Sequence, residues 1–201
     1  LEKMGVTRKI AKKRVSNVTP IKVQRIKKTR KTTYLPEKLL GVFDKEPTQL
    51  IQSGFDRQIL LDNDVGYDEE LDRITYPIRS RDGRLVAIIG RCNEPSLGKY
   101  RPYTRELRKY GLKISSVSKS EYLWRWDKVY PLLGSKGDLY VVEGFKAALW
   151  FVQAGIERVV ALMGSSLSQA QQRELEHCGQ RIILCLDGDR AGREGTLKIG
   201  H

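Results

Sequence analysis

The sequence contains no apolar run of 18 residues, few cysteines and no phosphate-binding G-x-x-x-x-G-K-[ST] loop. A shorter run cannot cross a membrane as a helix, so no membrane span is expected. The three cysteines, Cys92, Cys178 and Cys185, are odd in number and form no C-x-x-C pair. This usage argues against a disulfide scaffold and against zinc in this chain, and it favours a reducing, cytoplasmic compartment. The missing loop argues against a fused nucleotide-driven motor domain.

Positive charge is concentrated at the N-terminus. Residues 1–33 contain twelve of the 37 Lys and Arg residues and a single acid, so they hold 11 of the 13 net positive charges. Few large apolar residues interrupt them, and we expect a disordered leader without a core of its own. Two interpretations stay open: a solvated linker or tail, and an arm that binds phosphates, since blocks of one sign commonly bind nucleic acid. Charge alone does not distinguish DNA, RNA and an acidic membrane surface.

Residues 34–135 predict a small α+β subdomain. Residues 73–78 alternate apolar and polar side chains and read as a strand, and residues 85–89 form the strand that returns after a turn. Pro77 predicts that the first strand lies at a sheet edge, because proline cannot donate to a ladder. Residues 93–102 read as a loop. Short helices are expected at 36–43, 48–53, 55–61 and 119–130.

Residues 136–201 predict a different architecture, an α/β fold with a parallel sheet flanked by helices. Three apolar runs alternate with two helical patterns, and a β-α-β-α-β order implies parallel strands buried on both faces. Ser168 is the expected N-cap of the second helix, and Gly179 stands just past its end. The strands are expected at 139–142, 159–163 and 182–186, and the helices at 147–153 and 168–178.

Acidic side chains follow two of these strands directly. Glu143 comes after the first apolar run, and Asp187 and Asp189 come after the third. Since the carboxyl ends of parallel strands meet at one edge of a sheet, the three acids are expected to converge there. Carboxylate oxygens are ligands for Mg²⁺, and two such ions can clamp the attacking and leaving oxygens of phosphoryl transfer. Arg190 and Arg193 beside the acids can neutralise phosphate oxygens.

A plainer interpretation of the second acidic segment is a turn before a helix that is capped by an acid. The full pattern, an apolar strand with Glu-Gly and, 44 residues on, an apolar strand with Asp-Gly-Asp-Arg-Ala-Gly-Arg, favours the site instead. Three glycines in these segments are expected to allow close backbone approach or sharp turns: Gly144, Gly188 and Gly192.

These residues carry a family resemblance. Residues 138–195 resemble a Toprim domain, the metal-binding fold of DnaG-type primases, topoisomerases and some nucleases. Upstream motifs resemble the polymerase domain of DnaG-type primases, so that the likeness covers residues 34–200 and favours primases over topoisomerases. The motifs that carry it are Gly66-Tyr67-Asp68, Asp72 to Arg79, Asp82-Gly83-Arg84, Gly90-Arg91, Lys99-Tyr100, Lys119, Leu123-Trp124, Ala161 to Ser166 and Asp187 to Arg193.

The resemblance implies roles for the acids. Glu143 resembles the acid that helps to deprotonate the primer 3′-hydroxyl or holds a metal nearby. Asp187 and Asp189 resemble metal ligands under the incoming triphosphate. The implied cofactor is Mg²⁺ or Mn²⁺, with two or more ions bound by these three carboxylates.

The resemblance also implies a basic ridge. Arg91, Lys99 and Lys119 resemble the residues that hold the template strand and nucleotide phosphates, and Arg190 joins them. The plainer interpretation of each is a solvated surface charge. For the nearby aromatic residues packing is favoured over base stacking, because aromatic rings mostly supply buried area; these are Tyr100, Trp124 and Trp126.

The sequence departs from the family pattern at one acid. The family usually reads Glu-Gly-x-x-Asp, but here Ala147 replaces the final acid and Lys146 adds a positive charge beside it. This departure suggests a weakened metal position or a phage- or plasmid-like subfamily with altered ligation. The chain starts at Leu1, carries no zinc-binding module and stops at His201, ahead of a further family acid. We therefore expect a fragment with a truncated Toprim domain.

Three functions stay open on sequence. The favoured one is a primase core, a nucleotidyltransferase that makes short RNA primers on single-stranded DNA from NTPs during DNA replication. The others are a non-catalytic nucleic-acid-binding Toprim module, and a Toprim nuclease or topoisomerase fragment. The expected partners are single-stranded DNA and NTPs, with a replicative helicase left open, and a cytoplasmic monomer that binds no membrane is expected.

Overall fold

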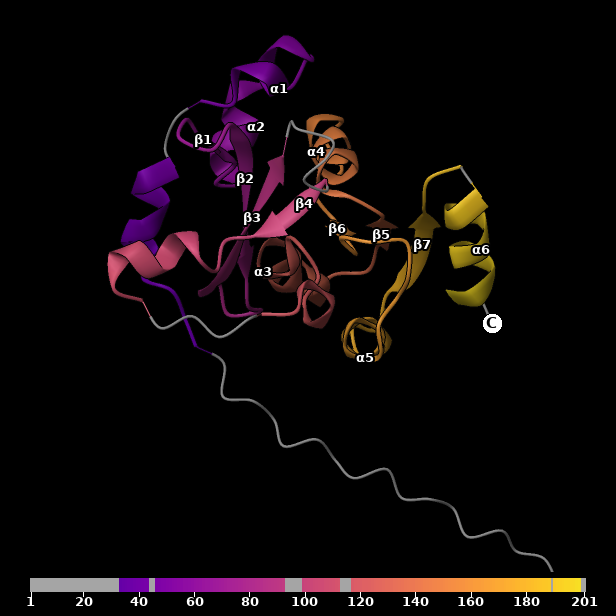
Figure 1. Cartoon of the computed structure of the whole chain (residues 1–201). Coiled ribbons are helices and arrows are strands. Elements are labelled where there is room, and N and C mark those ends of the chain that lie inside the picture. Colours follow the sequence, from indigo (N-terminus) through magenta and orange to yellow (C-terminus); the bar gives the residue numbers. More distant parts are fainter. Residues whose placement is uncertain (1–32, 44–45, 93–98, 113–116, 189, 200–201) are drawn as a thin grey trace, which may run out of the picture. The chain divides into compact units, whose positions relative to one another are not determined.

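A computed structural model describes residues 33–43, 46–92, 99–112, 117–188 and 190–199. Residues Thr32–His201 form one compact unit. Within the described residues this unit contains a four-stranded antiparallel sheet and a three-stranded parallel sheet (Figure 1). The predicted leader lies outside the described residues except for Thr33.

The antiparallel sheet is built from the segment in which the sequence predicts a hairpin. Its order is β1-β2-β3-β4, and Tyr76 of β2 pairs with Ile89 of β3. Ile74, Tyr76 and Ile78 alternate along β2 and enter a core shared with the second sheet. The opposite face packs against η1 and η3. The strands are β1 (Gly66–Asp68), β2 (Arg73–Arg79), β3 (Leu85–Cys92) and β4 (Tyr100–Pro102).

Short helices precede, follow and lie between these strands in the chain. The three predicted before residue 62 are present, the first as a 3-10 helix, and Asp56 caps α2 by accepting from the backbone N–H groups of Gln58 and Ile59. The helices are η1 (Glu37–Phe43), α1 (Thr48–Gln52), α2 (Arg57–Asp62), η3 (Glu106–Tyr110), η4 (Lys119–Glu121), α3 (Trp126–Val129) and η5 (Tyr130–Gly134).

The prediction that Pro77 marks an edge strand is wrong, because β2 lies between β1 and β3. Proline is tolerated here because β1 pairs only with residues 73–75 of β2 and ends before it reaches Pro77. The carbonyl of Pro77 instead accepts a hydrogen bond from the Trp124 indole, at 2.9 Å.

Two further predictions are corrected. The predicted helix over residues 119–130 is broken, because Tyr122 is extended and Arg125 has a left-handed φ of 68°. The predicted loop over residues 93–102 ends in β4, which pairs with β3. Residues 93–98 lie outside the described residues.

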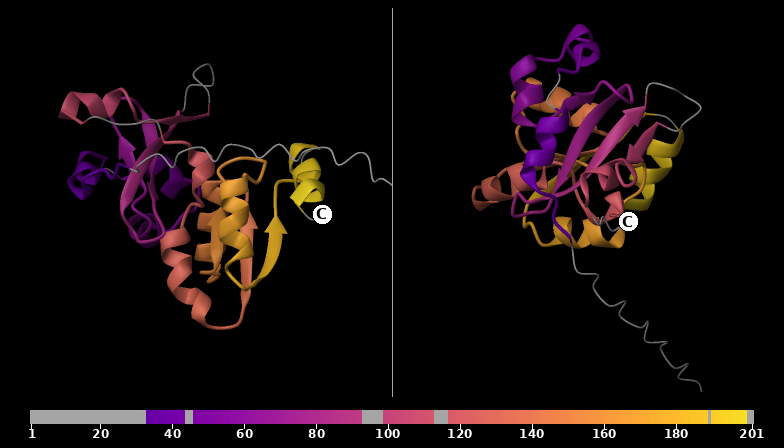
Figure 2. Two further views of the ribbon diagram at one scale, coloured as in Figure 1. Left: turned by 90° about the horizontal axis from the view of Figure 1, so that it is seen from below. Right: turned by 60° about the vertical axis from the view of Figure 1, so that its left-hand side comes forward.

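The parallel sheet confirms the predicted β-α-β-α-β order, with β5 between β6 and β7. Ser168 caps α5, as the sequence predicts, and the structure adds that Gln171 completes a capping box with it. In Figures 1 and 2, α6 lies beside β7. The elements are β5 (Asp138–Val142), α4 (Phe145–Gln153), β6 (Val159–Ala161), α5 (Gln169–Glu176), β7 (Arg181–Cys185) and α6 (Arg190–Ile199).

Helices cover both faces of this sheet. Leu139 and Val141 of β5 pack with α3 and α5, while Val142 packs with α4. The prediction of burial on both faces is wrong for β7, whose residues are half-buried or exposed. Its reason is that β7 pairs with β5 on one side and, within the described residues, with no strand on the other.

Trp124 joins the two sheets. Its backbone pairs with Ala161 of β6 through two hydrogen bonds of 2.9 and 3.2 Å, and its indole reaches Pro77 of β2. Trp124 is 3% and Trp126 4% exposed, which confirms that these aromatic residues serve packing. Helix α4 packs on residues of both sheets, so its N-terminal end and the neighbouring end of β3 are held in one core. Among the described helices, none has both the length and the apolar character of a membrane span.

Candidate active site at the carboxyl edge of the parallel sheet

Glu143 and Asp187 follow neighbouring strands. Val142, the last residue of β5, pairs with Cys185, the last residue of β7. Glu143 comes next in the chain after β5, and Asp187 lies two residues beyond β7, so both occupy the carboxyl edge as predicted. Glu143 is half-buried with its Oε2 shielded from solvent, whereas Asp187 is exposed.

Gly192 packs directly against the backbone of Asp187. A Cβ at this glycine would lie 1.9 Å from the Asp187 carbonyl oxygen, so only glycine allows the first turn of α6 to approach the acidic loop. Arg193 adds a hydrogen bond of 2.9 Å from its Nε to the Gly188 carbonyl. The predicted close approach is therefore confirmed at Gly192. At Gly144 and Gly188 a Cβ would meet nothing within 4 Å, and neither has a positive φ.

Two of the predicted site residues lie wholly or partly outside the described residues. Asp189 lies outside the described residues, and so does the side chain of Arg190, although Arg190 begins α6. Within the described part of the chain, no group of three or more Asp, Glu, His or Cys residues could hold a metal ion. The described donors are Glu143 and Asp187. Mg²⁺ is commonly bound by one or two carboxylates that share it with waters and substrate phosphates, so these donors fit such an ion.

Arg91 and Lys99 lie around Tyr100. Arg91 of β3 is the cross-strand partner of Tyr100 in β4, and the Lys99 Nζ is 5.8 Å from the Tyr100 ring centroid. The Tyr100 ring packs 5.4 Å from Phe145, which confirms the predicted packing role. Burial raises the pKa of the Tyr100 hydroxyl; the charge of Arg91 lowers it and that of Asp187 raises it. The antiparallel sheet thus brings its basic residues to the acidic edge of the parallel sheet.

Tyr76 packs with Tyr100 and Phe145 in one aromatic cluster. Its ring stacks on Phe145 at 4.3 Å and an interplanar angle of 14°. Burial and the neighbouring Tyr100 raise the pKa of the Tyr76 hydroxyl above its usual range, while the charge of Arg91 opposes them. Tyr76, Tyr100 and Phe145 therefore form a packed aromatic cluster, and Arg91 lies beside it.

Lys119 is exposed, and it reaches the carboxyl edge of the parallel sheet from η4 rather than from the antiparallel sheet. Its ammonium group donates to the carbonyl of Met163, which follows β6 and has a left-handed φ of 62°. The buried Gln171 amide fixes this loop by donating to the carbonyls of Tyr122 at 2.7 Å and Leu162 at 2.9 Å. Lys119 therefore stands at the carboxyl end of β6, the strand beside β5.

Sequence reasoning missed the neighbourhood of Lys146. The pKa of its ammonium group is lowered by burial and by the charges of Arg91 and Lys99. The sequence marks Lys146 only as a charge beside Ala147. No local signal connects it to basic residues of another sheet, because that proximity depends on how α4 packs.

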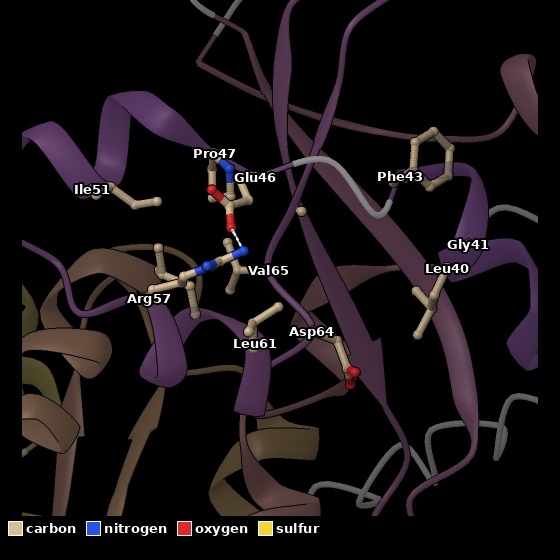
Figure 3. A pocket seen from close by; sticks show the side chains of 12 residues that line it. Leu40, Gly41, Phe43, Glu46, Pro47, Ile51, Arg57, Leu61, Asp64 and Val65 are labelled. Atoms are coloured by element: carbon tan, nitrogen blue, oxygen red, sulfur yellow. Dashed lines mark ion pairs between the residues drawn. The ribbon is translucent and has the colours of Figure 1, made fainter.

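A cavity of about 250 Å³ lies among η1, α1, α2 and β1 (Figure 3). Its lining is mainly apolar, with an ion pair between Arg57 and Glu46 and with Asp64 at its margin. None of the candidate site residues lines it, so it is separate from the acidic edge. The chief apolar lining residues are Leu40, Phe43, Pro47, Ile51, Leu61 and Val65.

Comparison with known sequences identifies relatives for most of the chain. Residues 137–201 match the Toprim domain family. The DNA primase of Lactococcus lactis is 29% identical over 161 residues, which cover 74% of this chain and 24% of that protein. The DNA primase of Deinococcus radiodurans is 34% identical over 163 residues, which cover 78% of this chain and 26% of that protein. The chain thus spans about a quarter of the length of these relatives.

Solved structures share its fold. A DnaG primase catalytic domain bound to ssDNA has a TM-score of 0.62 at 20% identity and covers 80% of this chain and 62% of its own. The Aquifex aeolicus primase, with zinc-binding and RNA polymerase domains, has a TM-score of 0.66 at 21% identity and covers 80% and 49%. At these identities the structures establish the fold alone. The sequence relatives place this chain in the DnaG-type primase family, and residues 137–201 belong to its Toprim domain.

Proposed function

We propose that this chain is the catalytic core of a DNA primase and synthesises short RNA primers on single-stranded DNA by metal-dependent nucleotidyl transfer. The observation that carries the proposal is the convergence of Glu143 and Asp187 with Arg91, which come from two different sheets. The names of the sequence relatives support it, as does the ssDNA bound to a structural neighbour.

The reaction joins a primer 3′-oxygen to the α-phosphorus of a nucleoside triphosphate and releases pyrophosphate. Glu143 is suited to accept the proton of the 3′-hydroxyl or to bind a metal, since one of its oxygens is shielded from bulk water. Asp187 and Asp189 would hold Mg²⁺ or Mn²⁺, which when bound stabilises negative charge on the phosphate oxygens.

The basic residues orient the phosphates in this proposal. Arg91 and Lys99 reach the acidic edge from the antiparallel sheet, and Lys119 reaches it from η4. A guanidinium group can bind two phosphate oxygens at once, so Arg91 is suited to fix the angle of attack. Arg190 is proposed to join them from the start of α6.

The proposal extends to the organisation of the chain. Residues 34–135 are the N-terminal subdomain and residues 136–201 the Toprim domain, and residues 1–33 are a basic linker or tail. NTPs and a single-stranded template are the proposed substrates of a cytoplasmic monomer. A replicative helicase partner and a phage- or plasmid-like subfamily stay predictions.

Primer synthesis tests the proposal directly. Single-stranded templates, labelled NTPs and Mg²⁺ or Mn²⁺ should yield short RNA, and both Asp187→Ala and Glu143→Gln should abolish it. Glu176→Gln, an exposed acid at the end of α5, is the matched control and should leave synthesis intact. Salt-dependent ssDNA binding without any RNA product would refute the catalytic role and favour a non-catalytic binding module.

A further inference from the structure

Lys146 follows a residue of the aromatic cluster beside Arg91 and Lys99. It follows Phe145 at the start of α4, and the Phe145 ring packs against Tyr76 and Tyr100. Tyr100 pairs across the strands with Arg91 and lies 5.8 Å from the Lys99 ammonium group. Cations from β3, from the residue ahead of β4 and from the first turn of α4 therefore lie near one another, and the charges of Arg91 and Lys99 act on Lys146.

Within the described residues, none of Arg91, Lys99 and Lys146 forms an ion pair with a carboxylate. The Lys146 Nζ lies 5.9 Å from the Phe55 ring centroid, and the pKa of Lys146 is lowered by burial and by the other two cations. A concentration of like charge is unfavourable until an anion neutralises it.

The residue after Lys146 adds no negative charge. Ala147 is half-buried and packs against the main core, so it presents a methyl group where a carboxylate would partly neutralise the lysine. Lys146 also stands three residues after Glu143, at the carboxyl edge of β5. An anion bound by Lys146 would thus lie beside the candidate metal-binding acids.

We propose that Lys146 is a phosphate-binding residue that acts with Arg91 and Lys99 on the triphosphate of the incoming nucleotide. This assignment rests on the proposed function. It adds Lys146 to the two cations already assigned to the site, and the packing of α4 sets its position. A nucleoside triphosphate is favoured over a DNA backbone, because Lys146 stands three residues after Glu143, where the reacting phosphates are proposed to bind.

Equilibrium binding of ATP and of inorganic tripolyphosphate tests this proposal without requiring catalysis. Lys146→Met should weaken both about tenfold or more, the effect of losing a hydrogen bond to a charged group, and Lys146→Arg should retain most of the affinity. Lys136→Met removes the same charge from an exposed loop before the amino end of β5. It should change neither the affinity for ATP nor the affinity for tripolyphosphate. Ala147→Asp should weaken metal-free tripolyphosphate binding while leaving Lys146 in place.

The same variants distinguish a role of Lys146 in nucleotide binding from a role in template binding. Binding of a short single-stranded DNA should change less than threefold in Lys146→Met. Unchanged ATP and tripolyphosphate binding in Lys146→Met would overturn the proposal, and so would a larger loss for DNA than for ATP. A wild-type protein that binds tripolyphosphate through Lys146 but makes no primers would refute the primase assignment alone, so the two failures are distinguishable.

Discussion

Arg125 is a buried arginine that joins the end of α2 to β6, and its removal should cost much of the stability. It is 5% exposed and adopts a left-handed φ of 68° directly after Trp124. Its guanidinium group donates to the Asn63 side chain at 2.8 Å and to the Val159 carbonyl at 3.1 Å. It also donates to the backbone and the carboxylate of Glu157, at 3.0 and 2.8 Å.

The cost of Arg125→Met follows from the acceptors left behind. The Asn63 amide oxygen and the Val159 carbonyl belong to buried residues, and each loses a donor. A buried acceptor left unsatisfied costs about 1–3 kcal/mol, so the pair predicts a loss of about 3 kcal/mol. Glu157 contributes little, because its side chain is 56% exposed and water can solvate its charge.

Urea denaturation followed by tryptophan fluorescence measures this cost, with Trp124 beside the mutated residue. Glu157→Gln is the matched control, since it weakens the ion pair without emptying the buried acceptors, and should cost less than about 1 kcal/mol. A loss below about 1 kcal/mol for Arg125→Met would show that the acceptors find other donors, and it would refute the reasoning.

Three further outcomes are expected. Gly192→Ala should displace the Asp187 backbone, because its Cβ would lie 1.9 Å from the carbonyl oxygen, and should cost about 1–3 kcal/mol in unfolding experiments and weaken Mn²⁺ binding in a titration. Gln171→Ala should cost about 1–3 kcal/mol of thermal stability, since it leaves two loop carbonyls without their donor. The hydrogen bond from Arg79 lowers the pKa of Glu37, so the stability Glu37 contributes is present above its ordinary pKa and is lost as the pH falls through the lowered one. Glu37→Gln should therefore destabilise by less than about 1 kcal/mol at pH 7 and by less at pH 3 than at pH 7, as urea midpoints at both pH values would report.

The sequence by itself determined the parallel half of the molecule and one edge of its site. Apolar runs set β5, β6 and β7, and Ser168 with Gln171 set the start of α5. These features depend on side chains within a few residues of each other, so they can be recognised in the sequence alone. The carboxyl-edge position of Glu143 and Asp187 followed, because an acid directly after a parallel strand has only one edge to occupy.

Tertiary structure alone decided the features that depend on contacts between elements far apart in the sequence. Pro77 lies inside a sheet because β1 ends before it, and the predicted helix over 119–130 breaks at Arg125, whose side chain is satisfied by residues far along the chain. The effect of the Arg91 charge on Lys146 likewise depends on α4 packing its Phe145 ring against Tyr76 and Tyr100. Such contacts come from burial across elements distant in sequence, and a local pattern of residues does not encode which of its many possible partners a buried side chain meets.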